Sequence, residues 1–345
     1  MKQRDLSLDL LRIVACVMVV MMHSPIPSDN SDGIILSSLS YFTAPCIGLF
    51  FMVSGALILP PPKKITNKGY SALIFLCKRL HRVLMPTLVW TLFYIAVKYC
   101  DGDVTIGGIC KSLFSMPFSA QGHGVLWFMY TLMGLYVITP ILHAWLRSAS
   151  ERDVRFYLLL WLITLCYPVL RMWVEVNDSA TGIFYYCSGY VGYFVLGYWL
   201  QRYGNKVSLK VASLLMGVSI AAPIVVKLQH WEVDFYSVFW YLSVFVVMQC
   251  VFWWQLMKRL QGLWHWADGV KRSITLISNL SFGIYLSHIF IMRHVVWKLP
   301  FVAQMHSQLL QMLVVALLTL VLSLSASMLL GYTPLGNMVV GWRRK

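Results

Sequence analysis

Long runs of apolar residues recur along nearly the whole chain and are separated by shorter polar stretches. A helix needs about 20 apolar residues to cross the hydrocarbon core of a bilayer. Windows of about 19 residues give ten such runs, at approximately 7–26, 34–59, 73–98, 125–146, 154–174, 183–200, 209–228, 236–257, 276–297 and 308–331. The pattern predicts an all-α, polytopic integral membrane helix bundle of about ten transmembrane helices, built as a single domain over residues 1–345.

The composition supports this prediction. Apolar residues (AVILMFWYC) make up 59% of the chain and charged residues 12%, whereas a soluble domain carries roughly 25% charged residues. A soluble globular fold is therefore excluded. The sequence also lacks a Walker loop, the glycine pattern of dinucleotide-binding folds and a His-Glu-x-x-His motif, so these nucleotide and zinc sites are not expected.

The basic residues are distributed unevenly between the connections. The net charge of +15 would suggest a nucleic-acid partner in a soluble protein. If the ten runs cross the membrane in turn, 21 of the 28 Lys and Arg lie on the side of the two termini and 6 on the other, with Arg12 inside the first run. By the positive-inside rule both termini are predicted to be cytoplasmic. The charge is then a topology signal, and no nucleic-acid partner is expected.

The eight cysteines do not form a recognisable metal motif. Six lie in or at the ends of apolar runs without paired ligand spacing, namely Cys16, Cys46, Cys77, Cys166, Cys187 and Cys250. We expect them to pack as small apolar residues, and we expect no metal site. Cys100 and Cys110 share a connection on the outer side, where a disulfide is one of two open alternatives.

The first apolar run contains three ionisable side chains, which are costly inside a membrane. Asp9 and Arg12 are three residues apart, so a local ion pair is one interpretation. Arg12 and His23 are eleven residues apart, close to three helical turns, and therefore share a face with a separation of about 16 Å. His23 is either a general base in a cavity or a hydrogen-bonding group between helices.

The third run opens with a basic cluster. Lys78, Arg79, His81 and Arg82 lie within five positions, ahead of Pro86. Arg79 and Arg82 are three residues apart and share a helix face, and the arginine fork suits bidentate binding of phosphate. The alternative is an anchor at the cytoplasmic surface, which explains most basic clusters at the ends of membrane helices.

Three further segments carry polar or small residues. His123 lies between two glycines ahead of Trp127, where it either lines a site or belongs to an interfacial segment. In the ninth run, Ser281, Tyr285 and His288 form one polar stripe, which we expect to face protein or water. In the second run, the Ser54-Gly55 pair favours close helix packing over a serine nucleophile.

Together these segments resemble acyltransferase family 3, polytopic bacterial membrane acyltransferases that modify glycans and other surface molecules. The resemblance rests on five segments in the expected order: Leu8-Asp9-Leu10-Leu11-Arg12 with His23, Phe50-Phe51 with Ser54-Gly55, Arg79-x-x-Arg82 with Pro86, Leu126-Trp127-Phe128, and Ser281-Phe282-Gly283-Ile284-Tyr285-Leu286 with His288. Without an appended soluble domain, the chain looks like the short single-domain O-acetyltransferases of the family. The family often has a histidine directly before the Leu-Trp pair, where this chain has Val125, which leaves open whether His123 substitutes for it.

This resemblance implies an enzyme of the bacterial cytoplasmic (inner) membrane that uses an acyl-coenzyme A, most often acetyl-coenzyme A, as co-substrate. The acceptor would be a hydroxyl of a glycan or of a lipid-linked saccharide, in contact with membrane lipids, and no cofactor would be permanently bound. Coenzyme A is a polyanion made in the cytoplasm, so we expect its phosphates to be bound by Lys78, Arg79 and Arg82, with Arg12 deeper in the membrane.

We expect His23 to act as the general base, because a hydroxyl is a poor nucleophile at neutral pH. Direct transfer without an acyl-enzyme is predicted, since the sequence shows no activated Ser or Cys. The candidate acceptor contacts are His123, Trp127, Tyr285 and His288. Two other classes stay open: a secondary transporter of an anionic lipid or sugar phosphate, and a purely structural membrane protein.

Overall fold

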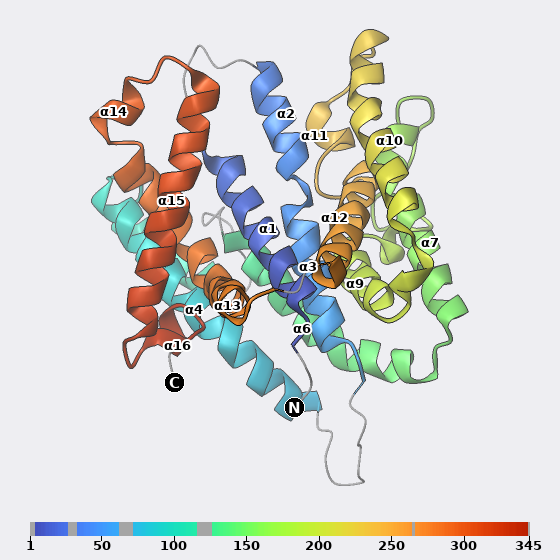
Figure 1. The fold of residues 1–345 in the computed structure, drawn as a ribbon, viewed down its shortest axis with the longest axis horizontal. Coiled ribbons are helices and arrows are strands. Elements are labelled where there is room, and N and C mark those ends of the chain that lie inside the picture. The colour runs from blue at the N-terminus through green and yellow to red at the C-terminus, as the bar shows by residue number, and fades with distance from the viewer. Residues whose placement is uncertain (1–3, 27–32, 62–71, 116–125, 264–265, 344–345) are drawn as a thin grey trace. The chain divides into compact units, whose positions relative to one another are not determined.

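The structure is a computed structural model that describes residues 4–26, 33–61, 72–115, 126–263 and 266–343. All regular secondary structure in these ranges is helical (Figure 1). The predicted all-α class is therefore confirmed for the described part of the chain.

The chain divides into two compact units, which we call unit 1 (residues 1–61 and 142–278) and unit 2 (residues 62–141 and 279–345). Unit 1 contains α1 (Leu6–His23), α2 (Gly33–Thr43), α3 (Pro45–Ile58), α7 (Glu151–Leu165), α8 (Tyr167–Leu170), η2 (Tyr185–Cys187), α9 (Val191–Tyr203), η3 (Gly204–Lys206), α10 (Leu209–Leu228), α11 (Phe235–Val238) and α12 (Val244–Leu263). Unit 2 contains α4 (Ala72–Cys100), α5 (Ile106–Ser115), the π-helical turn η4 (Met292–Val296), α14 (Pro300–Ala303), α15 (Gln308–Gly331) and α16 (Gly336–Val339). The boundaries between the units fall within α6 (Trp127–Ser148) and α13 (Asp268–Ile291).

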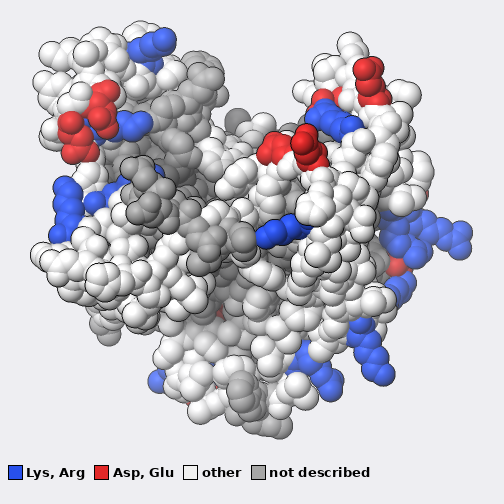
Figure 2. Space-filling view, turned by 90° about the horizontal axis from the view of Figure 1, so that it is seen from above, with Lys and Arg blue, Asp and Glu red and all other residues white. Residues whose placement is uncertain are grey.

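Eight stretches of the described chain are long and apolar enough to cross a membrane: Leu6–His23, Ser37–Ile58, Ile74–Cys100, Trp127–Ser148, Glu151–Leu170, Leu209–Leu228, Asp268–Val296 and Gln308–Gly331. Large apolar side chains on them are exposed, among them Leu214, Leu317 and Leu329, each at more than 60% of its surface. Figure 2 shows Lys, Arg, Asp and Glu in separate groups on the visible face, with wide areas of other residues between them. Such a surface is unfavourable in water but suits contact with lipid, so the protein is a multi-pass membrane protein.

The two remaining predicted runs do not form helices of this kind. In the run at 183–200, α9 has 13 residues, which is about 20 Å of helix against a hydrocarbon core of about 30 Å. The run at 236–257 is divided between α11 and α12, and α12 ends in a segment that carries Lys258 and Arg259. The count of ten spans and the cytoplasmic position of both termini therefore stay predictions.

The core of unit 1 is built around α3, which packs against α1, α9 and α12. Two glycines allow α3 and α9 to touch through their backbones. A Cβ atom added at Gly55 would overlap the carbonyl oxygen of Phe194, and one added at Gly197 would overlap the carbonyl oxygen of Met52. The close-packing interpretation of the Ser54-Gly55 pair is thus confirmed at Gly55.

In unit 2, α4 is fixed to the C-terminal segments by buried side chains. The indole Nε1 of Trp90 donates to the carbonyl oxygen of Val339 at 2.8 Å, and the Tyr94 hydroxyl donates to that of Leu286 at 2.8 Å. At the end of α4, Cys100 and its potential partner Cys110 on α5 are both free and exposed. The structure therefore contains no disulfide between them.

We predict that Gly55→Ala lowers the stability of the protein by about 1–3 kcal/mol, the usual range for overpacking a well-packed core. The added methyl group meets backbone atoms of α9, which cannot move aside as a flexible side chain can. Thermal unfolding in detergent measures the effect. Gly217→Ala on α10 is the matched control, because nothing lies within 4 Å of its added Cβ and alanine favours the helix. Equal stability of the two variants would contradict this account of the packing.

Candidate functional site

The start of α1 is held by a buried carboxylate. Asp9, with 3% of its surface exposed, accepts both arms of the Arg4 guanidinium at 2.6 and 2.7 Å and the Ser278 hydroxyl of α13 at 2.6 Å. The sequence spacing favours Arg12 as the ion-pair partner of Asp9, whereas the structure gives Asp9 the guanidinium of Arg4. This bidentate pair is local, because Arg4 lies two residues before α1. The bond from the Ser278 hydroxyl is the one that ties Asp9 to a different helix, α13.

A second carboxylate, Asp5, caps the N-terminus of α1. It accepts from the backbone N–H and the hydroxyl of Ser7, from the Gln201 amide at 2.8 Å and from the Lys258 ammonium at 2.6 Å. Burial raises the pKa of Asp5, but the hydrogen bonds from Lys258, Ser7 and Gln201 outweigh burial and hold the pKa below its ordinary value. The charged form therefore stabilises the fold above about pH 4, and this contribution is lost as the pH falls through the lowered pKa.

Arg12 and His23 lie on α1, which is continuous between them. Both side chains are half-buried. The Nδ1 atom of His23 lies 2.8 Å from the carbonyl oxygen of Val19, one turn earlier. Because a carbonyl oxygen only accepts, Nδ1 carries the proton of the neutral ring, and the basic lone pair is on Nε2. The helix backbone thus sets which of the two ring nitrogens of His23 is basic.

The basic cluster lies near the start of α4 in unit 2. Arg79 and Arg82 are exposed, and the Arg79 guanidinium lies 6.0 Å from the centre of the Phe75 ring. Neither arginine forms an ion pair with any residue that the structure describes. Lys78 belongs to the same helix, but its side chain lies outside the described part. The two arginines therefore have charges available for an anion from solution.

The polar stripe of α13 is buried inside unit 2, as its pattern predicted. Ser281, Tyr285 and His288 are at most 6% exposed. The Tyr285 ring packs against Phe128 of α6, with ring centres 5.3 Å apart, and against the His288 ring at 5.6 Å. The Nδ1 atom of His288 lies 2.5 Å from the carbonyl oxygen of Tyr285. The structure thus places the stripe beside the Trp127-Phe128 start of α6.

The predicted site residues belong to different units. Arg12 and His23 are in unit 1, whereas Arg79, Arg82, Trp127, Tyr285 and His288 are in unit 2. His123 lies outside the described residues. Among the described residues of unit 2, the rings of Tyr285 and His288 are in contact, and Tyr285 also packs on Phe128, the neighbour of Trp127.

Sequence reasoning missed most partners of α1. Gln201 and Lys258 follow Asp5 by 196 and 253 positions, so no local pattern predicts these contacts. Asp5 itself carried a usable signal, because an aspartate directly before an apolar helix is a favoured N-cap. A further buried histidine, His143, has its Nε2 atom 2.8 Å from the carbonyl oxygen of Ile58 and so caps the end of α3.

We predict that Asp9→Asn lowers stability by about 1.5–3 kcal/mol, the range for a hydrogen bond to a charged group. The amide cannot accept both arms of Arg4, which the carboxylate does. Thermal unfolding in detergent measures the loss. Asp268→Asn is the control, because that carboxylate is 85% exposed and its pairing with Lys271 at 3.3 Å is a surface ion pair of small effect. A loss at Asp9 no larger than at Asp268 would refute the anchoring role.

Comparison with known proteins bears on the whole chain. Residues 5–332 match the family model described as an acyltransferase domain. Searches of curated proteins and of solved structures gave no match. The family match covers both units, from the capping Asp5 of α1 to the end of α15. The chain belongs to acyltransferase family 3 and is a membrane acyltransferase.

Proposed function

We propose that the protein transfers an acyl group, most simply acetyl, from acyl-coenzyme A to a hydroxyl of a glycan or lipid-linked saccharide at the bacterial inner membrane. The observation that carries the proposal is the state of His23, an imidazole on a membrane helix of an acyltransferase, with Nδ1 held by the Val19 carbonyl and the basic lone pair on Nε2. The ten-span topology with cytoplasmic termini is part of the same proposal.

The donor is proposed to bind through its phosphates to α4. Coenzyme A brings several negative charges, and Arg79 and Arg82 present guanidinium groups that have no ion-pair partner among the described residues. Lys78 adds a third cation on the same helix, and Arg12 of α1 a fourth. Acyl-coenzyme A is a co-substrate in this scheme and leaves as free coenzyme A.

The transfer step needs one base. Nε2 of His23 takes the proton of the acceptor hydroxyl as its oxygen forms a bond to the thioester carbonyl carbon. The carbon–sulfur bond then breaks, and the coenzyme A thiolate leaves and takes up the proton from the imidazolium. No acyl-enzyme is formed. His123, Trp127, Tyr285 and His288 are proposed to contact the acceptor, for which a tyrosine hydroxyl and aromatic faces are suitable groups.

The direct test is thiol release. Purified protein is given acetyl-coenzyme A with and without candidate saccharide acceptors, and free coenzyme A is followed with time. Acceptor-dependent thiol release supports the proposal. Coupled flux of an anionic lipid or sugar phosphate in proteoliposomes, without consumption of coenzyme A, would instead identify a transporter.

We predict that Arg79→Ala or Arg82→Ala weakens binding of the acyl donor by roughly tenfold to a hundredfold, because each removes a charge-assisted contact to phosphate. Lysine at either position should rescue binding only in part, since an ammonium lacks the planar fork. Titration with acyl-coenzyme A measures the affinity. Arg272→Ala on α13 removes an equally exposed arginine and should leave the affinity unchanged. Unaltered donor binding in both α4 variants would identify the cluster as a membrane anchor.

We predict that His23→Ala lowers turnover by roughly 10²- to 10⁴-fold while donor binding and the amount of folded protein are retained. His23→Gln should be equally inactive, because an amide keeps a hydrogen bond but does not accept a proton at neutral pH. Activity of the wild type should rise with pH as the imidazole loses its proton.

The control for this experiment is His143, whose ring also hydrogen-bonds a backbone carbonyl. His143→Gln keeps an N–H donor for Ile58, so its turnover and pH profile should resemble those of the wild type. Near-normal turnover of His23→Gln would end the proposed mechanism and assign His23 a packing role like that of His143.

A further inference from the structure

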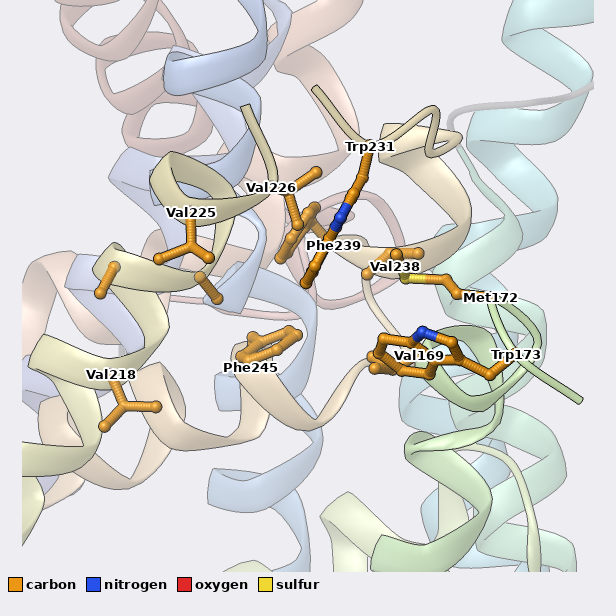
Figure 3. A pocket seen from close by; sticks show the side chains of 12 residues that line it. Val169, Met172, Trp173, Val218, Val225, Val226, Trp231, Val238, Phe239 and Phe245 are labelled. Atoms are coloured by element: carbon orange, nitrogen blue, oxygen red, sulfur yellow. The ribbon is translucent and has the colours of Figure 1, made fainter. Parts of the chain in front are cut away.

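Unit 1 contains two adjoining hollows on either side of α10. The smaller, of about 320 Å³, lies between α10 on one side and the Val169–Trp173 segment on the other, with Phe239 and Phe245 between them (Figure 3). All the side chains that line it are apolar or aromatic. Trp231, Val226 and Phe239 also line the second hollow, so they form a common wall.

The second hollow, the α2–α10 groove, is larger, at about 700 Å³, and falls in the size range of small-molecule sites. Phe42, Ile224 and Phe235 are among the side chains that make its walls apolar. Tyr41 presents its ring, because its hydroxyl donates to the carbonyl oxygen of Ser219. Besides the indole N–H of Trp231, the polar side chains available to a ligand are those of Ser37, Ser38 and Lys227.

Lys227 is the charged side chain that lines this groove. It lies in the last turn of α10 and is exposed. Its ammonium forms no ion pair with any residue in the described ranges. The α10–α11 connection also carries two carboxylates, Glu232 and Asp234, and neither pairs with Lys227. Asp234 caps α11 through the Tyr236 backbone N–H and the Ser237 hydroxyl. The groove thus combines apolar walls with the ammonium group of Lys227 and the hydroxyls of Ser37 and Ser38.

The groove lies near the end of α1 that carries His23. The Tyr241 hydroxyl lies 3.1 Å from the sulfur atom of Met22, the residue before His23. Phe239, which lines both hollows, precedes Tyr241 by two residues. The α11–α12 connection therefore joins the groove wall to the neighbourhood of the proposed base within unit 1.

We propose that the α2–α10 groove binds the apolar chain of a lipid phosphate, with Lys227 on the phosphate, and that this lipid carries the saccharide acceptor. An inorganic phosphate makes no use of the apolar walls, and an uncharged lipid makes no use of the lysine. The two features fit one amphipathic anion. The role as acceptor anchor rests on the function proposed above, whereas the binding itself is independent of it.

The experiment titrates the purified full-length protein in detergent with a polyprenyl monophosphate and follows lipid adducts by native mass spectrometry. The corresponding polyprenol, inorganic phosphate and phosphatidylglycerol are the comparison ligands. The polyprenyl phosphate should bind about fivefold more tightly than the polyprenol, the effect of one lysine on an anionic lipid group. Inorganic phosphate should not compete. The proposal is overturned if the polyprenol binds as tightly as the polyprenyl phosphate, or if phosphatidylglycerol competes as well as the polyprenyl phosphate does. Either result would show that the groove binds membrane lipids without selectivity.

The chain offers matched variants for each part of the groove. Lys227→Ala should abolish the preference for the phosphate, and Lys227→Arg should keep it. Lys210→Ala, an exposed lysine at the other end of α10, should keep the preference too. Ile224→Trp, which narrows the groove, should weaken binding of both polyprenyl lipids, whereas Leu214→Trp, on the same helix but outside the groove, should not. An equal effect of the Lys210 and Lys227 variants would overturn the assignment.

Separate outcomes identify which proposal fails. A protein that prefers the polyprenyl phosphate but releases no thiol from acetyl-coenzyme A with any acceptor refutes the proposed function and leaves the lipid site standing. A protein that transfers acyl groups but binds polyprenol and polyprenyl phosphate equally refutes only the lipid site. In an active protein, Lys227→Ala should raise KM for a lipid-linked acceptor about fivefold more than KM for the same saccharide without its lipid.

Discussion

The buried carboxylate of Asp9 is the constraint on which the candidate chemistry of unit 1 depends. An ionised group with 3% exposure is stable there only because Arg4 and Ser278 supply hydrogen bonds to both of its oxygens. The bond from Ser278, which lies on α13, fixes the rotation of α1 at its first turn. Since α1 is one continuous helix, the rotation set at Asp9 also sets the directions of Arg12 and His23.

The helices packed around α1 help to hold it in the orientation that Asp9 sets. α1 contacts α3 and α12, and α3 in turn contacts α9 through backbone approaches that only glycine permits at Gly55 and Gly197. Because α3 is packed this closely on α9, it offers α1 a surface that yields little. The tautomer of His23 is then fixed locally, by its own helix backbone through Val19. The orientation of His23 thus depends on contacts between α1 and distant parts of the chain. Which of its ring nitrogens is basic depends on a contact within α1 itself.

Much of the fold was predictable from the sequence because hydrophobicity in a membrane protein is a local property. The run at 308–331 agrees with α15 to the residue at its end, and α1 and α10 also agree closely. The run at 34–59 gives one candidate span, Ser37–Ile58, in which Pro45 starts a second helix. The run at 183–200 gives only the 13-residue α9, whose apolar residues pack inside the protein against α3.

The candidate site was predictable only where helical spacing decides it. The burial of Tyr285 and His288 on one stripe follows from their spacing of three residues on α13. The partner of Asp9 did not follow from spacing, because Arg4 precedes the helix and Ser278 lies 269 positions away. Hydrophobic patterns predict which face of a helix is buried. They do not predict which polar side chain of a neighbouring helix will hydrogen-bond to that face.

Ion pairing separates the basic residues by role. Arg4 and Lys258 neutralise carboxylates at the base of α1 and so serve the fold. Arg79, Arg82 and Lys227 have no such partner in the part of the chain that the structure describes. A cation beside apolar surface in a membrane protein attracts whatever anion can approach it. For α4 we propose that this anion is the phosphate of a soluble co-substrate, and for Lys227, which lines an apolar groove, the phosphate of a lipid.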